Sequence, residues 1–529
     1  MKKNKYKIKI IAAVFAASAL FSSISCVDDL EQVPITDVTS LSVFQDFANY
    51  PSALAKVYGG FANGGQESNG GNSDVGGIDG NFSQYTRILH TLQCLPTDEA
   101  VIAWNDGTLQ TIHKMTWDSS NEFVSGMYYR LYTEIAFCNE FIRNTTDEKL
   151  ASNNITGANL TEAKYMHAEA RYLRALAYYH ALDLFGNVPF VTENNYLPGS
   201  TTPPPRTTRA ELFNYVESEL LACEQLLKAP KANQYGRADQ AAVWALLARL
   251  YLNSQVYNNT NHYTDCITYS KKVISAGYGL KGKYGDLFLA DNDKNNPESI
   301  FTVNFDGQRT QTSGGTTYLV HAAVGGTMPA NQFGINGGWS GLRTTSSYVG
   351  LFNDNNDQRR NFYTSGQNLE INDLGSFNDG YAFVKYKNLT STGTAGSDNS
   401  GNFCDADIPM FRLADVYLMY AEAVLRGGSG GDPVTALGYV NALRTRAGAA
   451  PATSITTDYI LDERGRELGW ELTRRTDLIR YGKFTTGTYL WAWKGGVKAG
   501  KAVESFRNLY PIPAKDIVAN PNLIQNPGY

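Results

Sequence analysis

The spacing of apolar residues predicts long helices over much of the chain. In 161–185, Met166, Ala170, Leu173, Ala177 and Leu184 recur at intervals that place them on one helix face. The same periodicity predicts helices at 41–60, 121–143, 208–228, 237–257, 262–276, 409–426, 432–447 and 457–481. Alanines recur where two helices must approach each other, as they do in tetratricopeptide repeats, which have a period of about 34 residues. We interpret these apolar faces as core.

Polar, glycine-rich segments interrupt the helical pattern. Residues 59–83 form a glycine-rich loop, 201–208 (TTPPPRTT) form a stiff proline link, and 282–408 contain only short strand-like runs at 299–305 and 381–386. The predicted fold is therefore mostly α. A tetratricopeptide-like helical-repeat scaffold packs against a loop-rich irregular half with a few short strands. We expect one domain over 41–529, with helical repeats mainly at 41–281 and 409–484. Residues 282–408 form a binding insertion, since loops on a rigid scaffold commonly carry binding residues.

The first 25 residues have the pattern of a secretory signal peptide. Five lysines precede an apolar run at 10–21, which is too short to cross a bilayer of about 30 Å. Cys26 follows small residues, at the position where a bacterial lipoprotein carries its lipid-modified cysteine. We expect a lipid anchor at Cys26 and a tether over 26–40; cleavage and plain secretion is the alternative.

Charge and cysteine content narrow the classes of function. Without the leader, 41 basic residues face 51 acidic ones, and this acidic balance argues against a nucleic-acid partner. The remaining cysteines are widely spaced and odd in number, so we expect buried free thiols rather than disulfides or a zinc site. They are Cys94, Cys138, Cys223, Cys266 and Cys404.

The search for catalytic chemistry finds no supporting motif. There is no H-E-x-x-H helix, and the G-x-S-x-G at 427–431 follows a helix instead of joining a strand to one. We predict no enzymatic activity and no required cofactor. Paired carboxylates meet in space rather than in sequence, so a glycoside hydrolase stays an open alternative. Asp291, Asp293 and Asn295 alternate as calcium ligands do, which suggests a structural calcium site or, alternatively, a solvated turn.

Five segments, in order, carry a family resemblance. They are 169–189 (EARYLRALAYYHALDLFGNVP), 236–239 (GRAD), 411–423 (FRLADVYLMYAEA), 463–484 (ERGRELGWELTRRTDLIRYGKF) and 510–529, which begins YPIP and ends QNPGY. This series resembles the SusD/RagB family of outer-membrane nutrient-binding lipoproteins. The resemblance implies a non-catalytic, cell-surface protein. It would cap a SusC-like TonB-dependent transporter and hand it an oligosaccharide.

The resemblance is strongest to the starch-binding member of the family, in which an arc of aromatic rings cradles an α-1,4-glucan. Trp104, Tyr318 and Trp339 match that arc, and we expect all three to be exposed. Arg87 matches an arginine that hydrogen-bonds the sugar. Two positions depart: a second tryptophan of the arc is Ile102 here, and an asparagine contact falls near Gly107, where Asn105 is the candidate substitute.

The sequence therefore predicts a surface lipoprotein for starch-like α-glucan. Aromatic rings suit the C–H faces of sugars, while arginine and asparagine suit their hydroxyls. The departures at residues 102 and 107 keep a second hypothesis open, in which the cargo is another neutral glycan. A helical-repeat scaffold that binds protein partners is the third.

Overall fold

The computed structural model describes residues 40–65, 72–195 and 199–529. The chain forms two compact units, Met1–Asp46 and Phe47–Tyr529. The described part of the first unit, residues 40–46, contains helix α2 (Ser40–Phe44). The predicted signal peptide and the lipid-anchor residue Cys26 lie outside the described residues.

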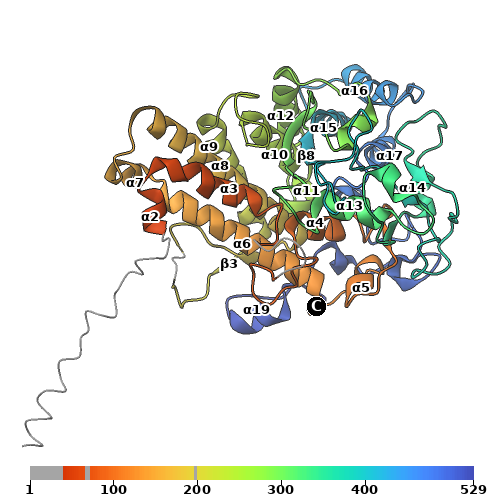
Figure 1. Cartoon of the computed structure of the whole chain (residues 1–529), viewed down its shortest axis with the longest axis horizontal. Helices are drawn as coiled ribbons and strands as arrows, with labels where there is room; N and C mark the ends of the chain where they lie inside the picture. Colours follow the sequence, from red (N-terminus) through yellow and green to blue (C-terminus); the bar gives the residue numbers. More distant parts are fainter. Residues whose placement is uncertain (1–39, 66–71, 196–198) are drawn as a thin grey trace, which may run out of the picture. The chain divides into compact units, whose positions relative to one another are not determined.

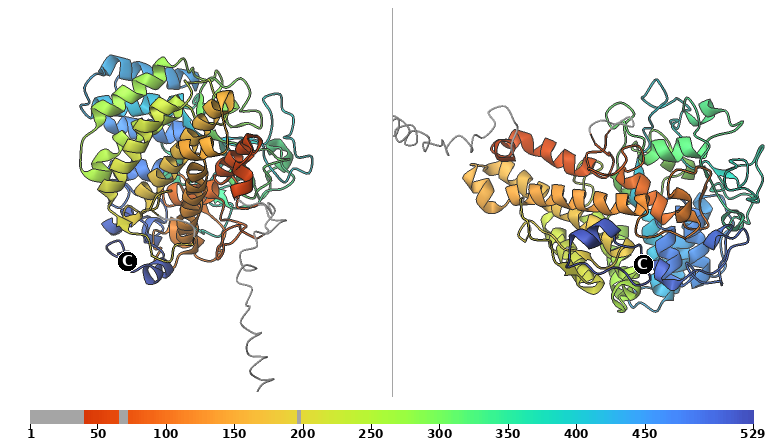
Figure 2. Two further views of the ribbon diagram at one scale, coloured as in Figure 1. Left: turned by 90° about the vertical axis from the view of Figure 1, so that its left-hand side faces the viewer. Right: turned by 90° about the horizontal axis from the view of Figure 1, so that it is seen from below.

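A series of helices dominates the second unit, each packed on the next (Figures 1 and 2). α6 packs on α8, α8 on α9, α9 on α10, α10 on α12, α12 on α15 and α15 on α16. Their bounds are α3 (Tyr50–Gly59), α6 (Glu122–Asn144), α8 (Gly157–Leu184), α9 (Arg209–Leu226), α10 (Gln240–Leu252), α12 (Tyr263–Ser275), α15 (Leu413–Leu425), α16 (Pro433–Arg446) and α17 (Thr457–Leu468). This arrangement confirms the predicted helical scaffold.

Shorter elements connect the array and build the irregular half. The short α-helices are α4 (Tyr85–Gln93), α5 (Leu109–His113), α7 (Asp147–Ser152), α11 (Ser254–Asn258), α13 (Gly315–Ala323), α14 (Ser346–Val349), α18 (Arg474–Arg480) and α19 (Ala514–Ala519). The 3₁₀ turns are η2 (Phe47–Asn49), η3 (Tyr284–Phe288), η4 (Ala330–Phe333), η5 (Lys494–Gly496) and η6 (Ser505–Asn508).

Helix starts follow local capping chemistry. The side chain of Asn121 accepts from the backbone N–H groups of Phe123 and Val124 and starts α6. Thr208 and Glu211 form a reciprocal capping box at α9. Such caps satisfy backbone donors that have no partner within the helix. The start of α6 is relevant to function because the first residues of this helix border the site described below.

Four predicted helices were wrong in extent. Pro51 fits only a first turn, so 41–60 divides into α2, η2 and α3. Residues 408–412 are fully buried and pair as a strand before α15 begins. The run 457–481 divides between α17 and α18 because Trp470 and Leu472 adopt left-handed backbone conformations. That bend buries Trp470, whose indole N–H donates to the carbonyl of Glu99 (3.0 Å). The predicted helix at 237–257 also divides, at Asn253, into α10 and α11.

The strands form four antiparallel pairs within the described residues. These are β1 (Val101–Ile102) with β5 (Leu342–Arg343), β2 (Val188–Pro189) with β3 (Arg206–Thr207), β4 (Ser299–Val303) with β8 (Ile408–Arg412), and β6 (Phe362–Tyr363) with β7 (Ala382–Phe383). The β1–β5 pair aligns Ile102 with Leu342. It thereby brings the chain after residue 102 beside the chain before residue 342.

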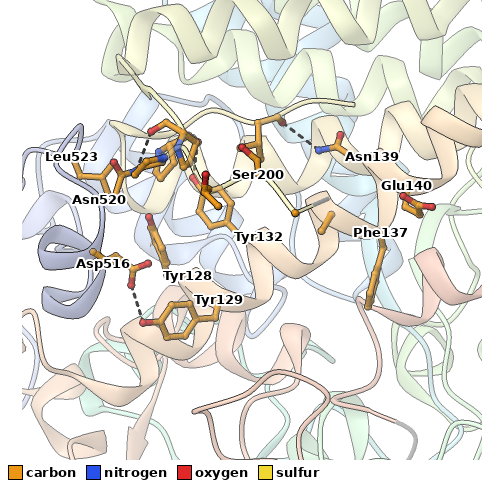
Figure 3. Close-up of a pocket in the computed structure, with 18 of the residues that line it drawn as sticks. Tyr128, Tyr129, Tyr132, Phe137, Asn139, Glu140, Ser200, Asp516, Asn520 and Leu523 are labelled. Atoms are coloured by element: carbon orange, nitrogen blue, oxygen red, sulfur yellow. Dashed lines mark hydrogen bonds between the residues drawn. The ribbon is translucent and has the colours of Figure 1, made fainter. Parts of the chain in front are cut away.

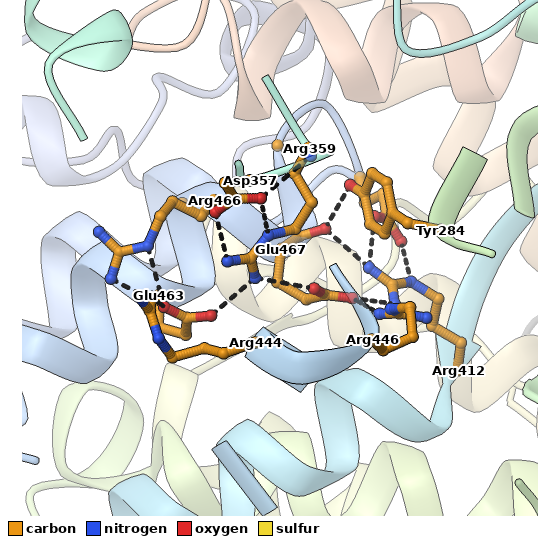
Figure 4. Close-up of polar contacts among 12 residues, drawn as sticks. Tyr284, Asp357, Arg359, Arg412, Arg444, Arg446, Glu463, Arg466 and Glu467 are labelled. Atoms are coloured by element: carbon orange, nitrogen blue, oxygen red, sulfur yellow. Dashed lines mark hydrogen bonds and ion pairs between the residues drawn. The ribbon is translucent and has the colours of Figure 1, made fainter. Parts of the chain in front are cut away.

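A buried ion network holds the C-terminal part of the unit together (Figure 4). Arg359 pairs with Asp357, Glu463 and Glu467, and Arg412 pairs with Glu298, Glu467 and Glu471. These charged side chains are almost wholly excluded from solvent. Removing one partner from such a cluster leaves an uncompensated buried charge, which is strongly destabilising. We use the term ion network for Glu298, Asp357, Arg359, Arg412, Arg444, Arg446, Glu463, Arg466, Glu467 and Glu471.

The cysteine prediction is confirmed. Cys94, Cys138, Cys223, Cys266 and Cys404 are free and buried. Among the described residues, no helix is long and apolar enough to cross a membrane.

Candidate functional site

Three separate segments bring the predicted aromatic residues together. Trp104 follows β1, Tyr318 lies on α13, and Trp339 precedes β5. The ring centroid of Trp104 lies 6.1 Å from that of Tyr318 and 6.3 Å from that of Trp339. Arg87 on α4 places its guanidinium carbon 4.6 Å from the Tyr318 centroid and 5.8 Å from the Trp104 centroid. The fold therefore assembles four of the five sequence-predicted residues.

Backbone hydrogen bonds fix the two tryptophans. The N–H of Trp339 donates to the carbonyl of His321 (2.7 Å), and the N–H of Ala103 donates to the carbonyl of Gly341 (2.9 Å). The indole N–H of Trp104 donates to the carbonyl of Trp339 (2.9 Å). Residue 341 must be small, because a Cβ there would lie 2.6 Å from the Trp104 ring. The rings are therefore positioned before any ligand arrives.

Exposure corrects one expectation. Trp104 and Trp339 are half-buried, but Tyr318 is only 2% exposed. Arg87 covers one side of the Tyr318 ring, and His90 meets it edge-on, with centroids 5.6 Å apart. Burial raises the pKa of Tyr318 to about 12. Tyr318 therefore supports Arg87 instead of offering an open face.

The two positions that depart from the family pattern supply neither of the ligand contacts that the pattern has there. Ile102 is buried in β1, so this position supplies no ring where the family pattern has a second tryptophan. Asn105 is exposed, but it does not line the hollow at this site. The neighbouring Asp106 does. The substitution of Asn105 for the missing asparagine contact is therefore not supported by this geometry.

A hollow of about 660 Å³ lies in front of Arg87, Trp104 and Trp339. Its lining adds polar residues that sequence reasoning missed, namely Asp79, Asn81, Asp106, Glu122 and Ser313. The proximity of Asp106 to Trp104 in the sequence was the one available signal. Asp79 and Asn81 come from the glycine-rich loop and Glu122 from the start of α6, so no local pattern links them.

Acidic groups outnumber basic ones in this hollow. Nη1 of Arg87 donates to the carbonyls of Asn81 (2.7 Å) and Ser313 (2.9 Å). Burial lowers the pKa of Arg87, partly offset by the ring of Tyr318 and the carboxylates of Asp106 and Asp79. The guanidinium nonetheless stays a cation at neutral pH. Asp79, Asp106 and Glu122 therefore face a single positive charge, an arrangement that favours uncharged, hydroxyl-rich ligands over anions.

The imidazole ring of His321 packs against the indole of Trp339. Their rings stack at a centroid distance of 4.8 Å and an angle of 23°. Nδ1 of His321 lies 2.7 Å from the carbonyl of Gly337 and must donate to it. Burial lowers the pKa of His321, so the ring is neutral near pH 7. The stack is therefore insensitive to pH in the neutral range.

The predicted calcium ligands have protein partners. Asp291 accepts hydrogen bonds from the backbone and hydroxyl of Ser391 (2.8 and 2.6 Å), and Asp293 pairs with Lys294. The carbonyl of Asn295 accepts from Lys281 (2.9 Å). Within the described ranges, no group of three or more acidic, histidine or cysteine side chains could hold a metal ion. The calcium site stays a prediction without support from this arrangement.

Comparisons with known proteins agree with this architecture. A family model described as "SusD family" matches residues 357–529, and one described as "Starch-binding associating with outer membrane" matches residues 83–252. The chain is 33% identical over the full length of both proteins to the starch-binding protein SusD of Bacteroides thetaiotaomicron. It is 25% identical to the SusD-like protein P2 of Formosa agariphila, over 99% of this chain and 100% of that one.

Solved structures show the same fold. A SusD homolog from Bacteroides thetaiotaomicron superposes with a TM-score of 0.73 at 20% identity, covering 93% of this chain and 99% of that one. Surface glycan-binding protein A from Bacteroides fluxus gives a TM-score of 0.69 at 21% identity, covering 91% and 99%. Full-length similarity in sequence and in structure leads to one conclusion: the chain belongs to the SusD family.

Proposed function

We propose that this protein captures starch-like α-glucan at the cell surface, without catalysis, and delivers it to a SusC-like TonB-dependent transporter. The convergence of Arg87, Trp104 and Trp339 on one hollow is the observation that carries the proposal. Membership of a family with a starch-binding relative at 33% identity supports the glycan class. Lipid attachment at Cys26 completes the proposal by keeping the site at the membrane.

The geometry suits a sugar that must later be released. A pyranose ring packs its C–H face on a half-buried indole, and its hydroxyls find donors on Arg87 and acceptors on Asp79 and Asp106. Because both tryptophans remain partly open to solvent, only part of the ligand is desolvated. An open site of this kind gives moderate affinity, which a delivery step requires.

Single-ring removal tests the assignment. Trp104→Ala or Trp339→Ala should weaken maltoheptaose binding by about tenfold or more, measured by isothermal titration. Trp244→Ala is the matched control, since it removes a half-buried indole from α10 in the helical array. Thermal unfolding verifies that each variant folds. Wild-type affinity in both site variants would contradict the proposed role of the rings.

Two missing contacts support a second class of cargo. Ile102 is buried and Asn105 does not line the hollow, so two contacts of the starch-binding pattern are missing here. The alternative is another neutral glycan handled in the same way. A glycan array with the purified protein separates the two, because preference for a β-linked neutral glycan would replace starch as the cargo.

Delivery is tested separately from binding. The proposal predicts that the protein co-purifies with a TonB-dependent transporter from gently solubilised outer membranes. Protease treatment of intact cells should also cleave it. A protein that stays intact and alone in both experiments would instead fit a periplasmic scaffold.

A further inference from the structure

A second, larger hollow lies between α6, α19 and residues 199–204 (Figure 3). Its volume is about 730 Å³. One wall is a stripe of aromatic rings on α6, formed by Tyr128, Tyr129, Tyr132 and Phe137, and the prolines at 203 and 204 also line the hollow. We infer that this hollow is a second glycan-binding site, which takes a neutral oligosaccharide independently of the Trp104 site.

Hydroxyl groups hold two tyrosines of the aromatic stripe in place. The hydroxyl of Tyr132 donates to the carbonyl of Pro189 (2.7 Å), and that of Tyr129 donates to the carboxylate of Asp516 (2.8 Å). The Tyr128 and Tyr132 rings lie 4.9 Å apart. Tyr129, Tyr132 and Phe137 are all half-buried. Tyr129 and Tyr132 are thus fixed but partly open to solvent, which suits them to pack against the C–H faces of sugars. The ammonium of Lys56 lies 4.7 Å from the ring centroid of Phe137.

The polar groups of the hollow select the class of ligand. Arg143 is the only cation that lines it within the described residues, and Glu140 pairs with this arginine at 2.5 Å. Tyr129 uses one oxygen of Asp516, and a carboxylate has lone pairs for several hydrogen bonds. A purely apolar ligand would supply no further donor to that carboxylate, and the carboxylates of Glu140 and Asp516 would repel an anion. Neutral hydroxyl groups satisfy both conditions.

The second hollow repeats the composition of the first. Each combines half-buried aromatic rings, carboxylates that exceed the available positive charge, and an amide side chain (Asn81 in the first, Asn520 in the second). Both also use α6: Glu122 and Phe123 line the first hollow, and Tyr128 to Arg143 line the second. At about 1.5 Å per residue, Phe123 and Tyr132 are separated by roughly 14 Å along the helix. The two sites are therefore neighbours on one rigid element, with no lining residue in common.

Residue-level footprinting with a carbene label tests the inference directly. The purified protein is labelled alone and with maltoheptaose, cellohexaose, laminarihexaose or mannohexaose. At least one oligosaccharide should reduce labelling of Tyr129 and Phe137, both in the wild type and in the Trp104→Ala/Trp339→Ala double variant. Tyr129→Ala should weaken that interaction by about tenfold, whereas Tyr165→Ala, a half-buried tyrosine on α8, should not.

This experiment can overturn either proposed site and leave the other standing. Protection of Trp104 and Trp339 alone would overturn the second site and leave the proposed function standing. Protection of Tyr129 and Phe137 alone would do the reverse. Protection of Tyr129 that disappears in the double variant would show an indirect effect and overturn an independent site. No protection at either place would overturn both.

Discussion

The ion network and the Trp104 hollow both gather charged residues from distant segments, but they balance charge in opposite ways. In the network, carboxylates such as Glu463 and Glu467 are fully buried and each meets more than one arginine. In the hollow, Asp79, Asp106 and Glu122 face Arg87 alone and stay open to solvent contact. The carboxylates of the ion network are fully paired with cations and form part of the rigid core. The carboxylates of the hollow outnumber its one cation, so they can hydrogen-bond a ligand.

The difference predicts how each region responds to change. A substitution in the ion network should lower the free energy of unfolding and leave the ligand preference of the folded protein unchanged. A substitution in the Trp104 hollow should change the affinity for the ligand and leave the free energy of unfolding unchanged. Four measurements, in order of decreasing effect, test this separation.

Arg412→Leu should lower the free energy of unfolding by about 3–5 kcal/mol, since it removes one cationic partner from each of the buried carboxylates of Glu298, Glu467 and Glu471. Urea unfolding measures the loss. The control is Arg309→Leu, which breaks an exposed pair with Asp306 and should change the midpoint little. Equal effects of the two variants would show that burial of the network is not what makes it stabilising.

Acid should weaken the buried ion pairs, because their carboxylates become protonated. Burial alone would raise the pKa of Asp415, but Arg249 and Arg464 hold it at about 2; in the same way Arg480 holds Glu422 at about 2. Both folded-state values lie below those of the unfolded chain, near 4. Each group's stabilisation, about 2–3 kcal/mol, is therefore present above pH ~4 and lost as pH falls towards 2. Urea midpoints that stay constant between pH 5 and 2.5 would contradict this.

Gly341→Ala should weaken maltoheptaose binding several-fold while the protein stays folded, because the new Cβ would displace the Trp104 ring. Gly337→Ala provides the control: it lies in the same loop, and a Cβ there meets nothing within 4 Å. Isothermal titration compares the two. If both alanine variants bind as the wild type does, the position of the Trp104 ring is not what determines affinity.

Asp106→Asn should produce the smallest effect. Affinity for a neutral oligosaccharide should change by no more than about twofold, because an amide keeps one acceptor. Binding of an oxidised, carboxylate-bearing maltoheptaose should improve, because one of three negative charges is gone. The improvement should diminish at high salt. No change in the ratio of the two affinities would show that the acidic residues do not select against anions.

The same contrast explains what the sequence could predict. The segments that carry the family resemblance contribute heavily to the buried interior: 463–484 supplies Glu463, Arg466 and Glu467 to the ion network. They identify the fold, and the comparisons confirm the family, the fold class, the outer-membrane location and a binding protein rather than an enzyme. They say little about the ligand.

The site was harder to predict because it depends on pairing between distant residues. Periodicity identified α6 and α8 well, since each buries a continuous face. It could not show that β1 pairs with β5, which is what places Trp104 beside Trp339. Nor could it show that Arg87 covers Tyr318 and removes it from the surface. Asp79 and Glu122 were missed for the same reason.

Isothermal titration with maltoheptaose, alongside cellohexaose, shows whether the Trp104 hollow binds α-glucan in preference to a β-linked glucan. We expect saturable binding of maltoheptaose and much weaker binding of cellohexaose, with the affinity for maltoheptaose reduced about tenfold or more in Trp104→Ala. Binding of cellohexaose with equal or greater affinity would contradict the α-glucan assignment. Silence with both sugars would contradict the claim that this hollow binds starch-like glycans.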